Sequence, residues 1–248
     1  MTTRQSEMDR RQFLKASGIL LVAGSGIRGL SLSAESRESK GGRGSAHKKR
    51  WAMGIDLTKC VPECELCITA CRKENNVAFF GDERLDVHWV RKAFVKKKQV
   101  PNAPETPVLL MCNHCDNPPC ASVCPVQATT QREDGIVIVD PHRCMGCRYC
   151  MVACPYNARF FNYKENPART NKKLPKRSFG VAESCTFCAH RIDVGKQPAC
   201  VEACPTKAII FGDLNDPNSA VSRFAAASNV RRIREDFGTE PKVYYLGL

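Results

Sequence analysis

The chain has 248 residues, 43% of them hydrophobic and 25% charged, which allows one large domain or two small ones and excludes a chain that is disordered throughout. Sixteen cysteines are the outstanding feature of the composition and need an explanation other than core packing. The formal charge is +13, but residues 1–50 hold eleven Lys or Arg against four acids, a balance of +7 that leaves +6 for the rest.

The first fifty residues differ in composition from the remainder of the chain. An arginine pair, Arg10 and Arg11, opens the run RRQFLK and is followed by a short, weakly apolar stretch. Residues 1–34 resemble a twin-arginine export signal, with an amphipathic first helix as the alternative. The stretch is too short to span a bilayer, and Arg28 interrupts it. Residues 35–50 are polar and rich in Gly and Ser, which predicts a flexible linker.

Twin-arginine export carries proteins that have already folded, often around a cofactor. We therefore expect a protein of the periplasm or of the outer face of the cytoplasmic membrane, held there by a partner. This route argues against a disulfide framework, which export by itself would favour.

The cysteines divide by spacing into four groups of four. Every group ends in a three-residue gap, and a proline follows the last three groups directly. The groups are Cys60, Cys64, Cys67 and Cys71; Cys112, Cys115, Cys120 and Cys124; Cys144, Cys147, Cys150 and Cys154; and Cys185, Cys188, Cys200 and Cys204.

The third group, CMGCRYCMVACP, is the bacterial ferredoxin run C-x2-C-x2-C-x3-C-P. In that run the first three thiolates bind one [4Fe–4S] cluster, while the fourth opens a short helix and reaches the neighbouring cluster. Zinc sites with four cysteines usually use two C-x-x-C knuckles that close on one ion, so zinc is an alternative that fits the spacing poorly. Covalent haem needs C-x-x-C-H, and in CTFCAH the histidine comes one residue too late.

The segment ATTQREDGIVIVD between the second and third groups predicts a strand, a turn at Asp134–Gly135 and a second strand. Two cysteine groups joined by this hairpin form one ferredoxin-like module, residues 107–165. Residues 51–106 together with 166–248 form an outer module into which the first is inserted. We therefore expect an α+β fold of two interleaved bacterial-ferredoxin-like modules with short strands, helices and long loops.

The ferredoxin rule assigns the ligands of the inserted module, and pseudo-symmetry extends the assignment to the outer one. Iron is bound through all sixteen cysteines, in four [4Fe–4S] clusters. The sets are Cys60, Cys64, Cys67 and Cys204 (cluster 1); Cys112, Cys115, Cys120 and Cys154 (cluster 2); Cys144, Cys147, Cys150 and Cys124 (cluster 3); and Cys185, Cys188, Cys200 and Cys71 (cluster 4). Four clusters of about −2 each would offset the remaining positive charge, so we expect no nucleic-acid partner.

Other residues suggest no substrate chemistry. The sequence contains no Ser/His/Asp arrangement, phosphate loop or G-x-G-x-x-G motif, so we expect no catalytic residues and an electron carrier without its own substrate site. His114 lies within a cysteine loop, where a hydrogen bond to sulfur is one option and packing or solvent exposure the favoured one. The basic residues 92–107 predict a solvated connecting segment.

The motifs CNHCDNPPC, CxxCxxCxxxCPY and C-x2-C-x11-C-x3-CP, in this order, resemble the four-cluster electron-transfer subunits of the dimethyl sulfoxide and polysulfide reductase family. The leader, CRKENNV and RRIREDFGTEPKVYY are most similar to the DsrO-type subunit of the DsrMKJOP complex linked to dissimilatory sulfite reductase. That resemblance implies electron relay between a quinone-reactive NrfD-type membrane subunit and a periplasmic multihaem cytochrome c. The alternatives are an electron-transfer subunit of an exported molybdopterin oxidoreductase or hydrogenase, and a zinc-stapled binding module.

One departure from the family pattern affects the first group. CVPECELC has three residues between Cys60 and Cys64, where the family commonly has two. The extra residue must move one thiol or bulge the backbone. If this motif cannot hold its cluster, the chain carries three clusters.

Overall fold

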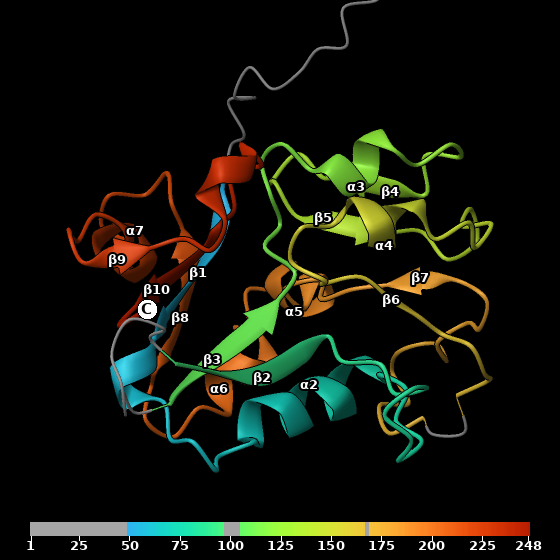
Figure 1. Ribbon diagram of the computed structural model, residues 1–248, viewed down its shortest axis with the longest axis horizontal. Helices are drawn as coiled ribbons and strands as arrows, with labels where there is room; N and C mark the ends of the chain where they lie inside the picture. Colours follow the sequence, from blue (N-terminus) through green and yellow to red (C-terminus); the bar gives the residue numbers. More distant parts are fainter. Residues whose placement is uncertain (1–48, 97–104, 167–168) are drawn as a thin grey trace, which may run out of the picture. The chain divides into compact units, whose positions relative to one another are not determined.

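The computed structural model describes residues 49–96, 105–166 and 169–248, which form short helices and strands joined by long loops (Figure 1). The predicted signal peptide and all but the last two residues of the predicted linker lie outside the described residues. The strands are β1 Trp51–Asp56, β2 Val90–Val95, β3 Thr106–Met111, β4 Thr129–Gln131, β5 Val137–Val139, β6 Phe160–Phe161, β7 Ala182–Glu183, β8 Ile209–Asp213, β9 Val230–Arg231 and β10 Val243–Leu246. The helices are η1 Leu57–Lys59, α2 Leu66–Asn75, α3 Pro119–Ser122, α4 Tyr149–Ala153, α5 Ala189–Ile192, α6 Ala199–Glu202, α7 Ala220–Ala225 and η2 Glu235–Phe237.

A four-stranded sheet joins the beginning and the end of the described chain. Its order is β8-β1-β10-β9, with β1 antiparallel to β8 and parallel to β10. In β1, Met53 lies opposite both Val243 and Phe211, and all three side chains are buried. Helix α7 covers this sheet at Gly54, where a Cβ would lie 2.6 Å from the Phe224 ring, so only glycine allows the close approach.

A second sheet, the antiparallel hairpin β2–β3, corrects part of the prediction for residues 92–107, because both ends of that segment lie in strands. Val90 pairs with Met111 and Val95 with Thr106. Buried residues of the hairpin, Val90, Val108 and Leu109, flank this segment, whereas Phe94 and Val95 within it are exposed. The Tyr245 hydroxyl of β10 donates to the Leu109 carbonyl over 2.8 Å, which links this hairpin to the four-stranded sheet.

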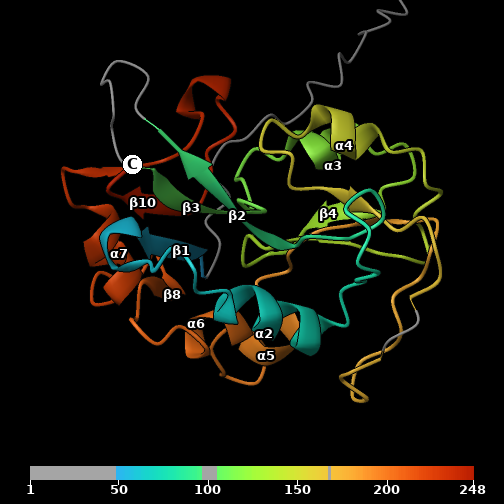
Figure 2. The same cartoon turned by 60° about the horizontal axis from the view of Figure 1, so that its bottom comes forward.

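The predicted hairpin between the second and third cysteine groups is confirmed. Strand β4 pairs antiparallel with β5, and Gly135 takes a positive φ of 80° in the turn between them. Helices α3 and α4, which contain cysteines of the two groups, pack against each other. Helix α2 lies beside α6 in the same way, as Figure 2 also shows.

The interior of the described part is built largely around sulfur. Nine of the sixteen cysteines are buried, and Cys67, Cys71, Cys112, Cys185 and Cys200 belong to the main hydrophobic cluster with Ile55, Leu109 and Tyr245. Small helices and short strands in small sheets confirm the predicted α+β, ferredoxin-like class. The division into two interleaved modules stays a prediction.

Candidate metal-cluster sites

Three of the cysteine groups share one local structure. The third cysteine lies within a short helix, and the fourth follows where that helix ends. The prediction that the fourth cysteine of the third group opens a helix is therefore wrong, because Cys154 stands at the end of α4. The pairs are Cys120 and Cys124 at α3, Cys150 and Cys154 at α4, and Cys200 and Cys204 at α6. In the first group, α2 is longer and contains both Cys67 and Cys71.

The fourth cysteine of these three groups begins a repeated turn, C-P-x-x-A. The residue before the alanine is left-handed in each, with φ near 51°, at Gln127, Asn157 and Lys207. In two of the turns the alanine N–H donates to the cysteine sulfur over 3.2 Å, from Ala128 to Cys124 and from Ala208 to Cys204. Sequence reasoning missed this repeat, although an alanine stands four positions after the last cysteine of each of these three groups.

The first group lacks the proline, and here a side chain instead of a backbone N–H donates to the fourth cysteine. Asn75 stands four residues after Cys71, at the position that the alanine holds elsewhere. Its amide Nδ2 lies 3.7 Å from the Cys71 sulfur and 3.5 Å from the Cys188 sulfur, and Asn75 is buried. The donor therefore reaches two thiols that are far apart in the sequence.

The buried thiols are held in surroundings that disfavour a free thiolate. Burial raises the pKa of Cys67 to about 11, with a further increase from Cys60 and Cys204. Burial likewise raises the pKa of Cys115 to about 12, and Cys112, Cys120 and Cys154 add to it. Because a free thiolate is unfavourable here, these groups need a cation to ionise, and a metal supplies one.

Cys124 has the opposite electrostatic setting. Burial opposes ionisation, but the backbone N–H groups of Thr129, Ala128 and Val126 outweigh it and lower the pKa of Cys124. Successive N–H groups that point at one sulfur stabilise a thiolate.

Four cysteines from two groups line a common cavity. Its wall includes Cys112, Cys115 and Cys120 of the second group together with Cys154 of the third, and Arg159 completes it. The Arg159 guanidinium donates to the Cys120 sulfur over 3.0 Å, and its Nη1 has no hydrogen-bond partner among the described residues. The cavity thus offers four soft donors and one buried cation, which suits an anionic iron–sulfur cluster.

The sixteen thiols are all free, so none is consumed by a disulfide. Across the described residues, no three His, Cys, Asp or Glu side chains converge on a position for one metal ion. In a [4Fe–4S] cluster each thiolate binds its own iron, and the bound cluster supplies one-electron redox chemistry. The N–H donors and the shared cavity show that the residues present fit such a group.

The irregular first loop is held by a side chain from β2. Lys92 places its Nζ 3.0 Å from the Val61 carbonyl oxygen and 2.8 Å from that of Pro62, and it also donates to the Cys64 carbonyl. The three carbonyls belong to the segment with the extra residue, so Lys92 stabilises the bulge that the sequence puts in question.

We expect Lys92→Gln to weaken this loop by about 2 kcal/mol, because charge-assisted hydrogen bonds contribute about 1.5–3 kcal/mol and this one is partly exposed to solvent. The measurement is iron and acid-labile sulfide per chain during mild oxidation. The variant should lose one cluster, up to four iron per chain, sooner than wild type does. Lys96→Gln, on an exposed residue just past the same strand, is the matched control. Equal iron retention in both variants would contradict the role of Lys92.

His114 is fully buried, so of the two favoured roles packing is correct and solvent exposure is wrong. Its ring lies 3.8 Å from the Phe187 ring, centroid to centroid. Its Nδ1 accepts from the Val137 N–H over 3.0 Å, and burial holds the pKa of His114 well below its usual range. A residue of the second cysteine loop therefore contacts the loop of the fourth.

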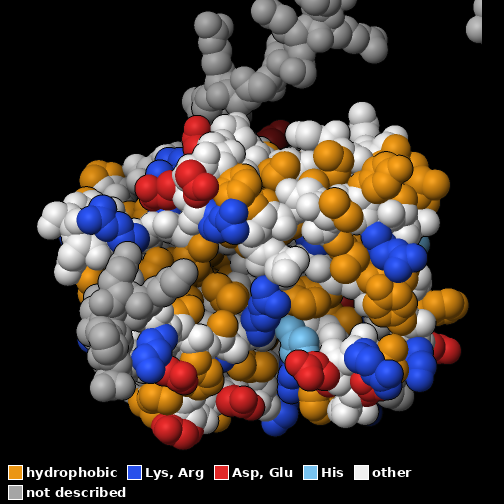
Figure 3. Space-filling view, in the orientation of Figure 1, with side chains coloured by type: hydrophobic (Ala, Val, Ile, Leu, Met, Phe, Trp, Pro, Cys, Tyr) orange, Lys and Arg blue, Asp and Glu red, His pale blue; other side chains and the backbone are white. Residues whose placement is uncertain are grey.

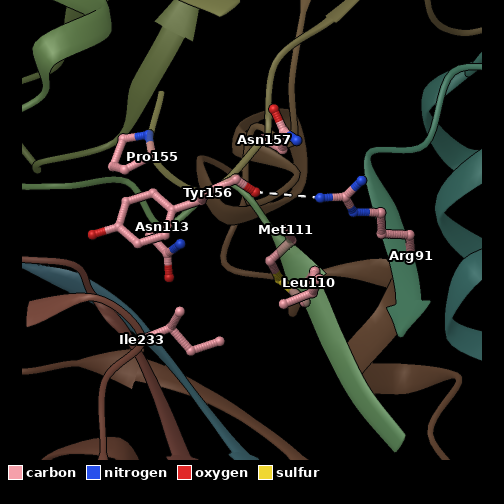
Figure 4. Close-up of a pocket in the computed structure, with 8 residues that line it drawn as sticks. All are labelled: Arg91, Leu110, Met111, Asn113, Pro155, Tyr156, Asn157 and Ile233. Carbon is pink, nitrogen blue, oxygen red and sulfur yellow. Dashed lines mark hydrogen bonds between the residues drawn. The ribbon is translucent and has the colours of Figure 1, made fainter. Parts of the chain in front are cut away.

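A separate pocket of about 250 Å³ opens beside this region (Figure 4). In its wall, the Arg91 guanidinium donates to the Tyr156 carbonyl over 3.4 Å. None of the eight lining residues is a Ser, Cys, His, Asp or Glu.

The surface around the third cysteine group is partly apolar. Cys147 is exposed, and Met145, Tyr149 and Val152 beside it are exposed large hydrophobic residues. Figure 3 shows apolar side chains over the region of α3 and α4. Within the described ranges, no helix has the length and apolar character to cross a membrane.

Cysteine loops of the ferredoxin type on an α+β frame define an iron–sulfur electron-transfer protein. The family described as a 4Fe-4S dicluster domain matches residues 108–214. The chain is 41% identical to the Hdr-like menaquinol oxidoreductase iron-sulfur subunit 1 of Archaeoglobus fulgidus, over 97% of this chain and 98% of the relative. It is 40% identical to a subunit of the tetrathionate reductase of Salmonella typhimurium, over 98% and 89% respectively. Protein NrfC of Escherichia coli is 37% identical, over 95% and 93%.

The chain belongs to the four-cluster iron–sulfur subunits of the dimethyl sulfoxide and polysulfide reductase family. Its cofactors are [4Fe–4S] clusters. It is an electron-transfer subunit of an oxidoreductase complex and not the catalytic subunit.

Proposed function

We propose that the protein is a periplasmic, DsrO-type relay that passes electrons between a quinone-reactive NrfD-type membrane subunit and a multihaem cytochrome c in a sulfite reductase-linked complex. The carrying observation is the 41% identity, over nearly the whole of both chains, to an iron–sulfur subunit named for menaquinol oxidation. The twin-arginine motif at Arg10 and Arg11 supports export in the folded state.

The proposed ligand sets are the four predicted ones, with the first three thiols of one group joined by the last thiol of another. The cavity shared by Cys112, Cys115, Cys120 and Cys154 supports cluster 2. Cys60 and Cys204 both raise the pKa of Cys67, which means that the three thiols lie close together and supports cluster 1. The sheet that joins β1 to β8 and β10 supports an outer module formed from both ends of the chain.

The clusters are proposed to follow one another in the order 1, 4, 2 and 3. Helix α2 carries both Cys67 of cluster 1 and Cys71 of cluster 4. The contact between the rings of His114 and Phe187 joins the loops of clusters 2 and 4. Arg159 faces thiols of both cluster 2 and cluster 3. The two ends of the relay are therefore the loop at Cys60–Cys64 and the exposed loop at Cys147.

The test uses the full chain, tagged at its C-terminus and purified anaerobically from native membranes. Co-purification of a polytopic membrane subunit and a c-type cytochrome is expected, together with reduction of the clusters by a menaquinol analogue. Oxidation of the reduced clusters by that cytochrome completes the relay. Recovery of the chain without either partner would overturn the proposal.

A second candidate is an electron-transfer subunit of an exported molybdopterin oxidoreductase, which the 40% identity to the tetrathionate reductase relative favours. The same purification separates the two functions. A large molybdopterin-containing subunit in place of the cytochrome would decide for the second.

A further inference from the structure

Arg159 is a buried cation without a carboxylate partner. The residue is 3% exposed, and it forms no ion pair with an Asp or Glu in the described parts of the chain. An unpaired guanidinium costs several kcal/mol to bury, roughly, unless negative charge compensates it. Something other than a side-chain carboxylate must therefore balance this charge.

The negative charge around Arg159 comes from sulfur. Its Nη2 donates to the Cys120 sulfur over 3.0 Å, while Nη1 is buried and has no hydrogen-bond partner among the described residues. The charges that act on it most strongly after burial are those of Cys112, Cys120, Cys150 and Cys154. Three of these belong to the proposed cluster 2 and Cys150 to the proposed cluster 3.

The contrast with Arg177, a partly buried arginine near other thiols, supports a special role for Arg159. Arg177 lies near Cys71 and Cys188, but the carboxylate of Glu183 also acts on it, and its Nε donates to the Asn75 carbonyl over 2.8 Å. Its charge is therefore partly balanced by protein groups. At Arg159, in the described part of the chain, the positive charge is balanced only by the thiolates and by the cluster that they would bind.

We propose that Arg159 sets the reduction potentials of clusters 2 and 3, raising that of cluster 2 most. Reduction takes one electron from the donor and no proton, so each cluster becomes more negative by one charge. A fixed cation in a poorly screened interior favours the more negative state, and its effect falls with distance. The inference rests on the proposed ligand sets but not on the identity of the partner proteins.

The test is a redox titration followed by EPR on the full chain, matured anaerobically with its clusters. Arg159→Gln removes the charge, Arg159→Met removes it with an apolar side chain of similar length, and Arg159→Lys keeps it. Arg148→Gln is the matched control, because Arg148 lies between Cys147 and Cys150 but is exposed. Iron and acid-labile sulfide are counted first, so that only fully loaded protein is titrated.

We expect Arg159→Gln to lower the equilibrium constant for reduction of one cluster at least tenfold, which corresponds to a midpoint about 59 mV lower. A second cluster should shift less and in the same direction. Arg159→Lys should retain most of the wild-type potential, and Arg148→Gln should change the constant less than twofold. This pattern would support the proposal even if the partner proteins were identified differently.

Four results would overturn it. The first is a fully loaded Arg159→Gln protein with unchanged midpoints, and the second is an equal shift in Arg148→Gln. The third is loss of a cluster from Arg159→Gln and Arg159→Met but not from Arg159→Lys. That result would show that the charge is needed to bind the cluster and does not act by setting its potential. A shift confined to signals that Cys60→Ser or Cys185→Ser abolishes would place the effect on clusters 1 or 4 and would also contradict it.

Discussion

Removal of iron is expected to unfold the chain from residue 51 onward. Nine buried cysteines lie in the interior, five of them within the main hydrophobic cluster. Structural metal sites in small domains contribute about 10 kcal/mol or more, as measured for zinc-finger peptides, against about 5–15 kcal/mol for the stability of a whole domain. Loss of several clusters should therefore exceed the stability that the remaining contacts supply.

The measurement is near-ultraviolet circular dichroism and a thermal melt after the iron has been stripped with an oxidant and a chelator. The near-ultraviolet signal and the cooperative transition should both disappear. Anaerobic protein treated with the chelator alone is the control, since it should keep its clusters and its melt. An iron-free chain with an unchanged melting temperature would show that the core of Ile55, Leu109 and Tyr245 suffices without metal.

This dependence explains why the helices near the cysteines are so short. Helices α3, α5 and α6 have four residues each, well below the length at which an isolated helix forms in water. Turn geometry and the N–H bonds to sulfur fix them only when the thiols are themselves fixed. Local structure and metal ligation therefore support each other in the same segments.

The sequence predicted what depends on short-range patterns. Cysteine spacing identified the cofactor, and the Asp134–Gly135 turn identified the β4–β5 hairpin. The β2–β3 hairpin was missed because the adjacent charged residues Arg91 and Lys92 interrupt the apolar pattern of β2, and a basic run of this kind is more often a solvated segment.

The residues that support the thiols could not be found in this way. Arg159 meets the Cys120 sulfur across 39 positions, and Asn75 meets the Cys188 sulfur across 113. Lys92 reaches the carbonyl of Cys64 across 28. Each contact depends on how separate segments fold together, and an isolated Arg, Asn or Lys carries no spacing signal of its own.

The ligand sets lead to the second large effect, which is expected at Cys154. This residue belongs to the third group by sequence, but it lines the cavity of Cys112, Cys115 and Cys120. Cys154→Ser replaces a soft thiolate by a hard hydroxyl of similar size, so it should remove or alter cluster 2 while cluster 3 persists. The change should abolish one EPR signal of the reduced protein, with a loss of up to four iron per chain.

The decisive comparison uses this variant together with further serine variants of the second and third cysteine groups. Cys154→Ser should alter the signal that Cys112→Ser alters, and Cys124→Ser should alter the one that Cys144→Ser alters. If each sequence group held its own cluster, the pairs would be exchanged, with Cys154 matching Cys144 and Cys124 matching Cys112. That result would rule out the crossed ligand sets and with them the proposed place of Arg159 between clusters 2 and 3, while leaving the family and its electron-transfer role intact.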